Sequence, residues 1–365
     1  MKIELNKTTA LKKKPADETQ LQFGRIFTDH MFIMEYEESR GWHSPRIQPF
    51  GDITLSPAAM VLHYSQEIFE GLKAYRRPDG EIQLFRPKEN FKRLNVSAER
   101  SVIPNIDVDF ALKALCELIR IDEDWVPRSE GASLYLRPYI IATDPFLGVR
   151  PSNKYLFMII MSPVGAYYPN GLNPVSIAVE EEYVRAIKGG MGFAKAGGNY
   201  AASLMGQKKA QSEGYEQVLW LDGVERKYIE EVGSMNVFLI VENSNGRAGE
   251  LEVITPELSG SILPGITRMS VIELCRKWGL KVTERKISAD EVFQLYDTGK
   301  LKEIFGTGTA VAISPVGTLK KSGRVITIND GKIGEVSQKL YSTLTGIQYG
   351  KIPDDMGWTK AIRGL

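Results

Sequence analysis

Cysteine, excess charge of either sign and long apolar runs are all scarce in this sequence. Among its 365 residues are two cysteines, Cys116 and Cys275, each within an apolar pattern of helical type. We therefore expect buried free thiols in a reducing compartment and no disulfide. Lysine and arginine together number 46, and aspartate and glutamate 45, so the net charge is +1. That balance gives no electrostatic reason to expect a nucleic acid or an anionic membrane as partner.

No apolar run is long enough to span a bilayer, and residues 155–161 have the length of a core strand. The N-terminal region contains neither an apolar signal segment nor an arginine-rich amphipathic leader. Residues 1 to about 20 have little periodicity and are expected to form a loose tail that is either poorly ordered or draped over the surface. These absences favour a cytoplasmic protein, and no metal site is expected.

The chain exceeds the usual size of one domain, so two domains are expected. Strand and helix patterns follow each other in irregular order, which predicts an α+β or mixed α/β class. We expect a smaller N-terminal α/β domain over 1–164, an interdomain loop over 165–174 and a larger C-terminal α/β domain over 175–365. The clearest helical patterns cover 87–102, 107–121, 200–212 and 267–278.

One stretch, 189–200, combines five glycines with a single lysine, Lys195, which Ala194 and Ala196 flank. A lysine among small residues tends to be desolvated, which is the setting of a nucleophilic amine. A solvated surface loop is the simplest alternative. A phosphate-binding P-loop is excluded, because that motif requires glycine before the lysine and serine or threonine after it.

The hexapeptide 195–200, Lys-Ala-Gly-Gly-Asn-Tyr, resembles the active-site signature of the branched-chain aminotransferases, which are pyridoxal-phosphate enzymes of fold type IV. Seven further motifs occur in the order of that family, from about residue 24 to residue 350. The resemblance implies two α/β domains with pyridoxal 5′-phosphate between them. The motifs lie at 27–31, 63–65, 69–74, 134–138, 231–236, 263–265 and 308–310.

The resemblance assigns the cofactor chemistry to three side chains. Lys195 would carry the Schiff base and move the proton, Glu231 would face the pyridine nitrogen, and Tyr200 would donate to the phenolic oxygen. Each has a plainer alternative: Glu230 and Glu231 as a solvated pair at a strand start, and Tyr200 as a core aromatic residue. The spacing to the Met-Asn of 235–236 favours Glu231 over Glu230.

The phosphate site is expected at the start of the helix over 267–278, because helix N-termini attract anions. The resemblance implies that the amides of Ile266 and Thr267, the guanidinium of Arg93 and the hydroxyl of Thr309 form it. Without the resemblance, Arg93 would be one arginine on a basic helix face. A dinucleotide motif at 306–310 is rejected, because its third glycine is missing.

The substrate site follows from the same resemblance. Thr309 and Ala310 would hold the α-carboxylate, and the side-chain pocket would have Leu147 and Val149 from the second subunit of a homodimer. The pocket also has an aromatic residue near position 24, where Phe23 precedes Gly24. The remaining pocket residues are Tyr64, Phe69, Tyr135, Arg137 and Tyr167.

The sequence departs from the family at two points. Some members have Cys-x-x-Cys after Gly-Thr-Ala, and the corresponding residues here are Val311 and Ser314, so that redox switch is absent. The usual threonine of Glu-Val-Gly-Thr-Met-Asn is Ser234, which keeps the hydroxyl group.

We therefore expect a homodimeric transaminase that exchanges the amino group between L-leucine, L-isoleucine or L-valine and 2-oxoglutarate. A D-amino-acid aminotransferase or an aminodeoxychorismate lyase of the same fold is the first alternative, although Tyr135 and Arg137 argue against both. A phosphate-binding module without covalent chemistry is the second alternative. It would explain the glycine loops but not the combination of Lys195 with Glu231.

Overall fold

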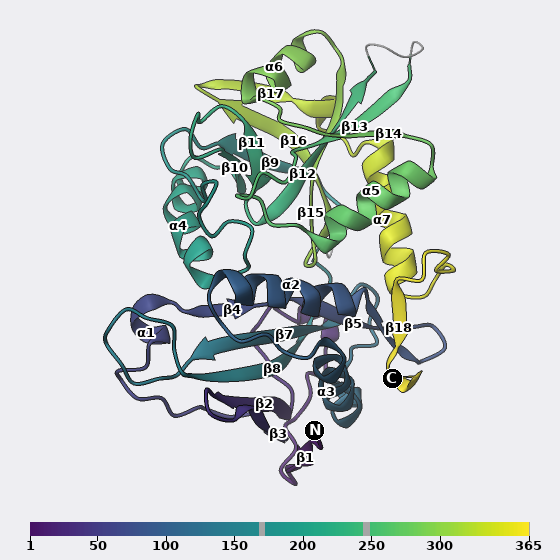
Figure 1. The fold of residues 1–365 in the computed structure, drawn as a ribbon. Coiled ribbons are helices and arrows are strands. Elements are labelled where there is room, and N and C mark those ends of the chain that lie inside the picture. Colours follow the sequence, from purple (N-terminus) through teal and green to yellow (C-terminus); the bar gives the residue numbers. More distant parts are fainter. Residues whose placement is uncertain (168–171, 244–248, 365) are drawn as a thin grey trace. The chain divides into compact units, whose positions relative to one another are not determined.

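The computed structural model describes residues 1–167, 172–243 and 249–364. The chain forms two compact units (Figure 1). Unit 1 comprises Met1–Pro169, Ala194–Gly197 and Gly346–Leu365, and unit 2 comprises Asn170–Phe193 and Gly198–Thr345. This division differs from the expected second domain over 175–365, because two of its segments belong to unit 1. Residues 168–171 of the expected interdomain loop lie outside the described residues.

Unit 1 is built on a largely antiparallel sheet with the strand order β1-β3-β2-β8-β7-β5-β6-β18, and β4 pairs with β7. The turn at 78–80 joins β5 to β6, as its Pro-Asp-Gly sequence predicts, and Gly80 supplies the positive φ of 86°. The C-terminal segment joins this unit because β18 pairs with β6. The strands are β1 Glu4–Leu5, β2 His30–Glu37, β3 Gly41–Pro49, β4 Glu67–Phe69, β5 Leu72–Arg76, β6 Ile82–Phe85, β7 Ser133–Ala142, β8 Lys154–Val164 and β18 Thr359–Ala361.

Three helices of unit 1 are α1 (Val61–Tyr64), α2 (Pro87–Arg100) and α3 (Val108–Ile121). Pro87 starts α2 at a position where its missing amide hydrogen costs nothing, and Phe91, Leu94 and Ala98 form its buried face. The carboxylate of Asp107 caps α3 by accepting from the amide of Phe110. The two longer helices contact each other and pack on the sheet (Figure 1). Cys116 of α3 is buried and unpaired.

The N-terminal segment is attached to unit 1, which agrees with the expectation of a segment draped over the surface and not with that of a poorly ordered one. β1 pairs with β3, and the amide of Thr8 donates to Nε2 of His30 at 3.0 Å. The amide of Lys12 donates to the Asp29 carboxylate at 2.8 Å. His30 and Asp29 are buried polar groups that require partners, and the tail supplies some of them. The aperiodic sequence could not reveal this.

Unit 2 is built on a mixed sheet with the order β11-β10-β9-β16-β15-β12-β13-β14, and β17 pairs with β16. An additional pairing of β11 with β12 closes β11, β10, β9, β16, β15 and β12 into a barrel. Stacked Phe238 and Phe305 lie in its core, with a centroid distance of 5.3 Å. The strands are β9 Val175–Val179, β10 Gln217–Leu221, β11 Ile229–Val232, β12 Met235–Glu242, β13 Leu251–Thr255, β14 Lys281–Glu284, β15 Leu301–Gly308, β16 Ala312–Lys321 and β17 Arg324–Thr327.

The longer helices that follow are α4 (Gly197–Ser212), α5 (Ile266–Lys277), α6 (Ala289–Asp297) and α7 (Glu335–Gln348). The helices expected at 200–212 and 267–278 correspond to α4 and α5, whereas α6 and α7 were not expected. Cys275 of α5 is buried and unpaired. Short 3-10 turns occupy Glu18–Gln20, Glu123–Trp125, Ile328–Gly331 and Ile362–Gly364. In the described part of the chain, no helix combines the length and the apolar composition needed to cross a membrane.

Candidate active site

Lys195 lies in the short segment of unit 1 that interrupts unit 2. Its amide donates to Oγ of Ser97 on α2 at 2.8 Å, and its carbonyl accepts from the amide of Phe69 at 3.0 Å. The next residue, Ala196, forms an isolated β-bridge with Ile68. The backbone of Lys195 is therefore fixed on both sides, which contradicts the alternative of a solvated surface loop.

The amine of Lys195 has an aromatic ring and a buried carboxylate as neighbours. Its Nζ lies 4.8 Å from the ring centroid of Phe69. Burial alone would raise the pKa of the Glu70 carboxyl, but the Arg93 guanidinium and then the Lys195 ammonium hold that pKa below its ordinary value. The positive end of Lys195 is therefore within electrostatic reach of Glu70.

Arg93 is held by Glu70 in a bidentate pair. Its Nε and Nη2 donate to the two carboxylate oxygens at 2.7 and 2.9 Å. The Glu70 carboxylate also accepts from Nδ2 of Asn90 at 2.8 Å and from the amide of Gly71 at 3.1 Å. Such fork-to-fork pairing fixes the plane of the guanidinium. The structure thus orients Arg93 from α2, and its expected phosphate contact stays a prediction.

Tyr135 and Arg137 lie on one face of β7, as the alternation of a strand requires. Nη2 of Arg137 donates to Oη of Tyr135 at 3.0 Å, and its guanidinium lies 4.6 Å from the ring centroid of Phe69. The Nε of Arg137 is buried and has no hydrogen-bond partner in the described part of the chain. A Cβ at Gly71 would overlap the Tyr135 hydroxyl, so this position requires glycine. The cluster of Phe69, Tyr135 and Arg137 therefore has an unused hydrogen-bond donor, the Nε of Arg137.

The aromatic residue expected near position 24 is Phe23. Its ring packs edge-on against Tyr135 with a centroid distance of 4.7 Å, whereas Gly24 has a φ of 69° and no side chain to offer. An assignment to position 24 is therefore wrong by one residue. The pocket group of unit 1 is thus Phe23, Phe69, Tyr135 and Arg137.

Four other expected pocket residues are exposed on unit 1. Tyr64 at the end of α1 donates from its hydroxyl to the carbonyl of Leu147. The exposed fractions are 62% for Leu147 and 86% for Val149, and Tyr167 is also exposed. Two aliphatic side chains this exposed differ from Phe69, Tyr135 and Arg137, which are half-buried. The expected contribution of Leu147 and Val149 to the pocket of a second subunit stays a prediction.

Unit 2 places Glu231 in a row across three strands. Glu231 of β11 is the register partner of Asn236 on β12, which is the register partner of Thr307 on β15. The three side chains are buried, and Oγ1 of Thr307 has no hydrogen-bond partner within the described residues. Arg185 forms an ion pair with the Glu231 carboxylate. A buried row of polar groups with one unsatisfied hydroxyl is suited to a polar ligand.

Glu230 and Glu231 lie on opposite faces of β11 and have different partners. Glu230 accepts from Oγ of Ser261. Burial raises the pKa of the Glu230 carboxyl, the Ser261 hydrogen bond opposes this rise, and the charge of Asp222 adds to it. Both acids are buried, which contradicts the alternative of a solvated pair.

The start of α5 lies beside Asn236. Nδ2 of Asn236 donates to the carbonyl of Leu263 at 2.9 Å, and a Cβ at Gly265 would overlap the Asn236 side chain. No side chain caps α5, and no described residue accepts a hydrogen bond from the amides of Ile266 and Thr267. Unit 2 thus combines the expected ring-nitrogen acid with two amides that are available to an anion.

The other expected cofactor and substrate residues of unit 2 lie near these elements in the sequence. Tyr200 is on α4. Burial lowers the pKa of Arg185, and the neighbouring Tyr200 and Glu230 side chains oppose this lowering. Thr309 and Ala310 form the turn between β15 and β16. The common site expected for that turn and the start of α5 stays a prediction.

Three residues of this arrangement were not expected from the sequence: Arg185, Ser97 and Asn90. Their contacts are Arg185 to Glu231, Ser97 to Lys195, and Asn90 to Glu70. In the sequence these three are polar residues near apolar ones, and many residues with a purely structural role have the same surroundings. Their partners are distant in sequence, so only the fold reveals the contacts.

Comparisons with known proteins agree with this geometry. The pattern of the family described as Amino-transferase class IV matches residues 67–319. Branched-chain-amino-acid aminotransferase 2 of Bacillus subtilis (strain 168) is 54% identical over 365 residues, which are 100% of this chain and 98% of that protein.

Two solved structures are also similar. The branched-chain amino acid aminotransferase of Escherichia coli aligns with a TM-score of 0.74 at 26% identity, covering 92% of this chain and 99% of that one. The T.th. branched-chain amino acid aminotransferase complexed with N-(5′-phosphopyridoxyl)-L-glutamate aligns with a TM-score of 0.72 at 25% identity, covering 90% of this chain and 98% of that one.

Proposed function

The chain belongs to the amino-transferase class IV family and is a transaminase, and we propose that it exchanges the amino group between L-leucine, L-isoleucine or L-valine and 2-oxoglutarate. The observation that supports this most is Lys195, whose backbone is bonded to Ser97 and Phe69 and whose amine faces the Phe69 ring. The relatives named above act on branched-chain amino acids according to their names. The family resemblance expected from the sequence motifs is confirmed.

The cofactor is pyridoxal 5′-phosphate, and the residues present fit it. Its aldehyde requires an amine, which Lys195 would supply, and its ring nitrogen requires an acid, which Glu231 would supply. Its phosphate requires donors, and the amides of Ile266 and Thr267 have no other acceptor among the described residues. Tyr200, Arg93 and Thr309 complete the proposed set. Bound, the cofactor withdraws electrons from the substrate Cα, which makes the proton there acidic.

The residues around the reacting atoms have three proposed roles: proton transfer, contact with the ring nitrogen and positioning of Lys195. Nζ of Lys195 would hold the cofactor through its aldehyde and would move the proton at Cα of the amino acid. The Glu231 carboxylate is buried and paired with Arg185, and it would hold a proton at the ring nitrogen. Ser97 and the Phe69 amide keep the lysine backbone in place while its amine moves.

The pocket group explains how two different substrates fit. The Phe69 and Tyr135 rings offer apolar surface to a branched side chain, whereas Arg137 offers charged donors to the distal carboxylate of 2-oxoglutarate. Thr309 and Ala310 are proposed to hold the α-carboxylate.

We further propose a homodimer in the cytoplasm. Leu147 and Val149 expose aliphatic side chains that a second copy of the chain would cover, as the family resemblance implies. The measurement is analytical ultracentrifugation, with Val149→Lys expected to favour the monomer. Unchanged dimerisation would remove these residues from the interface.

Covalent trapping tests the central assignment. Borohydride reduction of the holoenzyme followed by peptide mapping is expected to label Lys195, and Lys195→Ala is expected to be inactive. Label on Lys73 or Lys188 would contradict the proposal. Addition of L-leucine is expected to bleach the absorbance of the bound cofactor, whereas D-leucine is not. Bleaching by the D-enantiomer alone would favour a D-amino-acid aminotransferase.

A further inference from the structure

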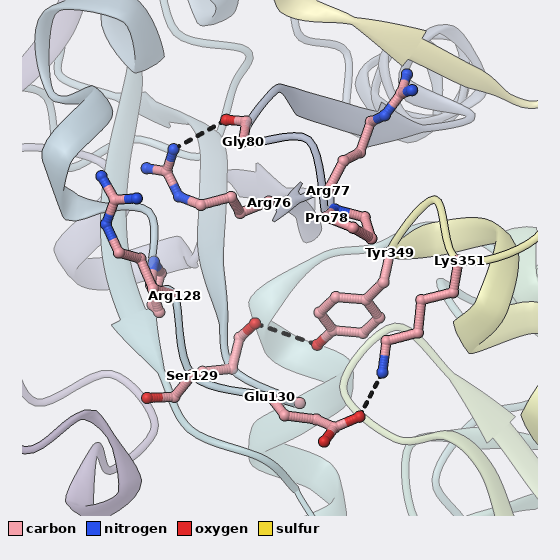
Figure 2. Close-up of a pocket in the computed structure, with 12 residues that line it drawn as sticks. Arg76, Arg77, Pro78, Gly80, Arg128, Ser129, Glu130, Tyr349 and Lys351 are labelled. Carbon is pink, nitrogen blue, oxygen red and sulfur yellow. Dashed lines mark hydrogen bonds and ion pairs between the residues drawn. The ribbon is translucent and has the colours of Figure 1, made fainter.

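A basic cavity of about 330 Å³ lies within unit 1, away from the residues assigned above (Figure 2). Three segments line it: the turn between β5 and β6, the loop that precedes β7, and the segment after α7. Its lining includes four cationic side chains and one carboxylate, which belong to Arg76, Arg77, Arg128, Lys351 and Glu130. The cavity therefore carries an excess of positive charge.

Two of the four cations have their own acids. Nη2 of Arg77 lies 2.8 Å from the Asp79 carboxylate, and Nζ of Lys351 pairs with Glu130 (Figure 2). These pairs compensate the charges of Arg77 and Lys351. The positive charge that remains belongs to Arg76 and Arg128.

Arg76 is fixed by carbonyl groups, which do not neutralise its charge. Its Nη1 donates to Gly80 at 3.1 Å, its Nη2 to Glu123 at 2.9 Å, and its Nε to Val126 at 3.3 Å, in each case to the main-chain oxygen. A guanidinium held in this way is preorganised, because its rotamer entropy is already lost. Its remaining donor capacity is on Nη1.

Arg128 lies beside Arg76. Its guanidinium forms no hydrogen bond or ion pair within the part of the chain that the structure describes, and Figure 2 shows both guanidinium groups on the same wall. Burial lowers the pKa of Arg76, and the charge of Arg128 lowers it further, so the two cations are close enough to repel each other. An anion between them would remove this repulsion.

The acids nearest to Arg76 are engaged elsewhere. One oxygen of Glu18 accepts from the amides of Arg128 and Ser129 at 2.8 and 2.7 Å. The carboxylate of Glu123 lies 3.5 Å from Arg363, and that of Asp124 lies 3.6 Å from Lys14. These three acids oppose the lowering of the Arg76 pKa but do not bond to its guanidinium.

The wall opposite Arg76 and Arg128 also has apolar surface beside its paired charges. Tyr349 donates to the carbonyl of Ala132 at 3.2 Å and packs edge-on against Tyr75 at 5.0 Å, so its ring is held in place. Pro78 and Pro127 add rigid apolar surface. The volume is near the lower end of small-molecule sites, which run from about 300 to 1,000 Å³. A bare inorganic ion would leave much of this space unfilled.

We propose that this cavity binds a small organic dianion, a phosphate monoester or a dicarboxylate, whose charged group lies between Arg76 and Arg128. The carbon body of the ligand packs against Tyr349. This site is separate from the transamination residues and does not rest on the proposed substrate.

The test is calorimetric titration of the holoenzyme with glycerol 3-phosphate and with succinate, and with glycerol and butyrate as uncharged and singly charged counterparts. Each dianion that fits is expected to bind, and Arg128→Gln is expected to weaken it about 10-fold or more. Arg128 is the chosen position because Arg76→Gln would also remove up to four structural hydrogen bonds. Arg40→Gln, in the exposed turn between β2 and β3, makes the same charge change and is expected to leave binding unchanged.

The outcomes separate the sources of any signal. Binding of only one of the two dianions identifies the acid group that the site prefers and supports the proposal. If Arg137→Met abolishes binding and Arg128→Gln does not, the dianion binds in the substrate pocket, and the proposal is overturned. Equal weakening by Arg40→Gln and Arg128→Gln shows non-specific charge attraction and overturns it, as does absence of binding by both dianions. Failure of the transaminase proposal would leave these results unaffected.

Discussion

Each unit contains a buried carboxylate that pairs with an arginine, and the two pairs are built differently. In unit 1, the carboxylate of Glu70 accepts two hydrogen bonds from Arg93, one from Asn90 and one from the Gly71 amide. The carboxylate is therefore close to saturated, since its two oxygens offer about four acceptor sites.

In unit 2, Glu231 is paired with Arg185 and has one long contact, 3.4 Å, with Nδ2 of Asn236. That amide nitrogen makes its shorter bond, 2.9 Å, to the carbonyl of Leu263. The Glu231 carboxylate thus retains acceptor capacity for a further donor. A carboxylate whose acceptor sites are all occupied can only hold its partner in place. A carboxylate with an unoccupied acceptor site can also bind a ligand. We therefore infer a positioning role for Glu70 and a ligand-contacting role for Glu231.

The strongest way to break this comparison is Glu70→Ala. Removing one partner of a buried pair leaves the other charge uncompensated, which costs about 3–5 kcal/mol. The free energy of unfolding of unit 1 is expected to fall by this amount, measured as a lower urea midpoint. The control is Glu89→Ala on the same helix as Arg93, because its 3.0 Å pair with Lys92 is on the surface and is worth about 1 kcal/mol or less. Equal losses in both variants would show that Glu70 has no special structural role.

The second change acts on rate. Glu231→Gln retains an oxygen for Arg185 but loses the charge that the ring nitrogen requires, so the rate is expected to fall about 10²–10³-fold. Glu230→Gln is expected to retain nearly normal activity, because Glu230 accepts from Ser261 on the other face of β11. The measurement is the steady-state rate with L-leucine. A larger loss in Glu230→Gln would mean that the assignment is wrong by one residue.

The parts of the fold that follow from local pattern were predictable. Helices α2, α3, α4 and α5 were expected within a few residues of their observed bounds. Apolar faces indicate α2 and α3, and glycines just beyond the ends of α4 and α5 act as stop signals. Gly279, with a φ of 78°, follows the end of α5 as expected.

Structure that depends on distant partners was not predictable. β18 forms because β6 offers it an edge far away in the sequence, and nothing in residues 359–361 indicates this. The candidate site shows the same limit. Motifs identified Lys195 and Glu231, whereas Ser97 and Arg185 are ordinary residues until the fold brings them to those positions.

The third change concerns Lys73, a cation of β5 in the same unit as Arg93. Burial lowers the pKa of Lys73 from 10.5 to about 8. Between these two values the unfolded chain binds a proton that the folded chain does not, so the free energy of unfolding rises with pH. Below pH 8 the burial cost is complete, and the difference between 10.5 and about 8 corresponds to about 3 kcal/mol.

Lys73→Met is therefore expected to stabilise unit 1 at pH 7 by up to about 3 kcal/mol. The advantage is expected to shrink as the pH rises from about 8 to about 10. Urea unfolding across this pH range measures it, with Lys92→Met on the surface of α2 as the control. A stability difference that does not change with pH would mean that Lys73 keeps its ordinary pKa in the folded chain.

The smallest expected effect concerns Arg137, which is held in place like Arg93 of the Glu70 pair and has unused bonding capacity like Glu231 of the Arg185 pair. Like Arg93 it is held by its surroundings, through the Tyr135 hydroxyl at 3.0 Å and the Phe69 ring at 4.6 Å. Unlike Arg93, it has a buried Nε with no acceptor among the described residues. A buried donor without an acceptor is costly, and a substrate carboxylate would satisfy it.

Arg137→Met is therefore expected to weaken the half-reaction with glutamate or 2-oxoglutarate by about 10- to 200-fold, since a hydrogen bond to a charged group is worth roughly 1.5–3 kcal/mol. The half-reaction with L-leucine is expected to change little, because an isobutyl group offers the guanidinium nothing to bond. Single-turnover absorbance changes of the cofactor measure the two half-reactions separately, and Arg40→Met, in the exposed turn between β2 and β3, is the matched control. Equal losses in both half-reactions would make Arg137 a structural residue or a ligand of the α-carboxylate, which every substrate carries.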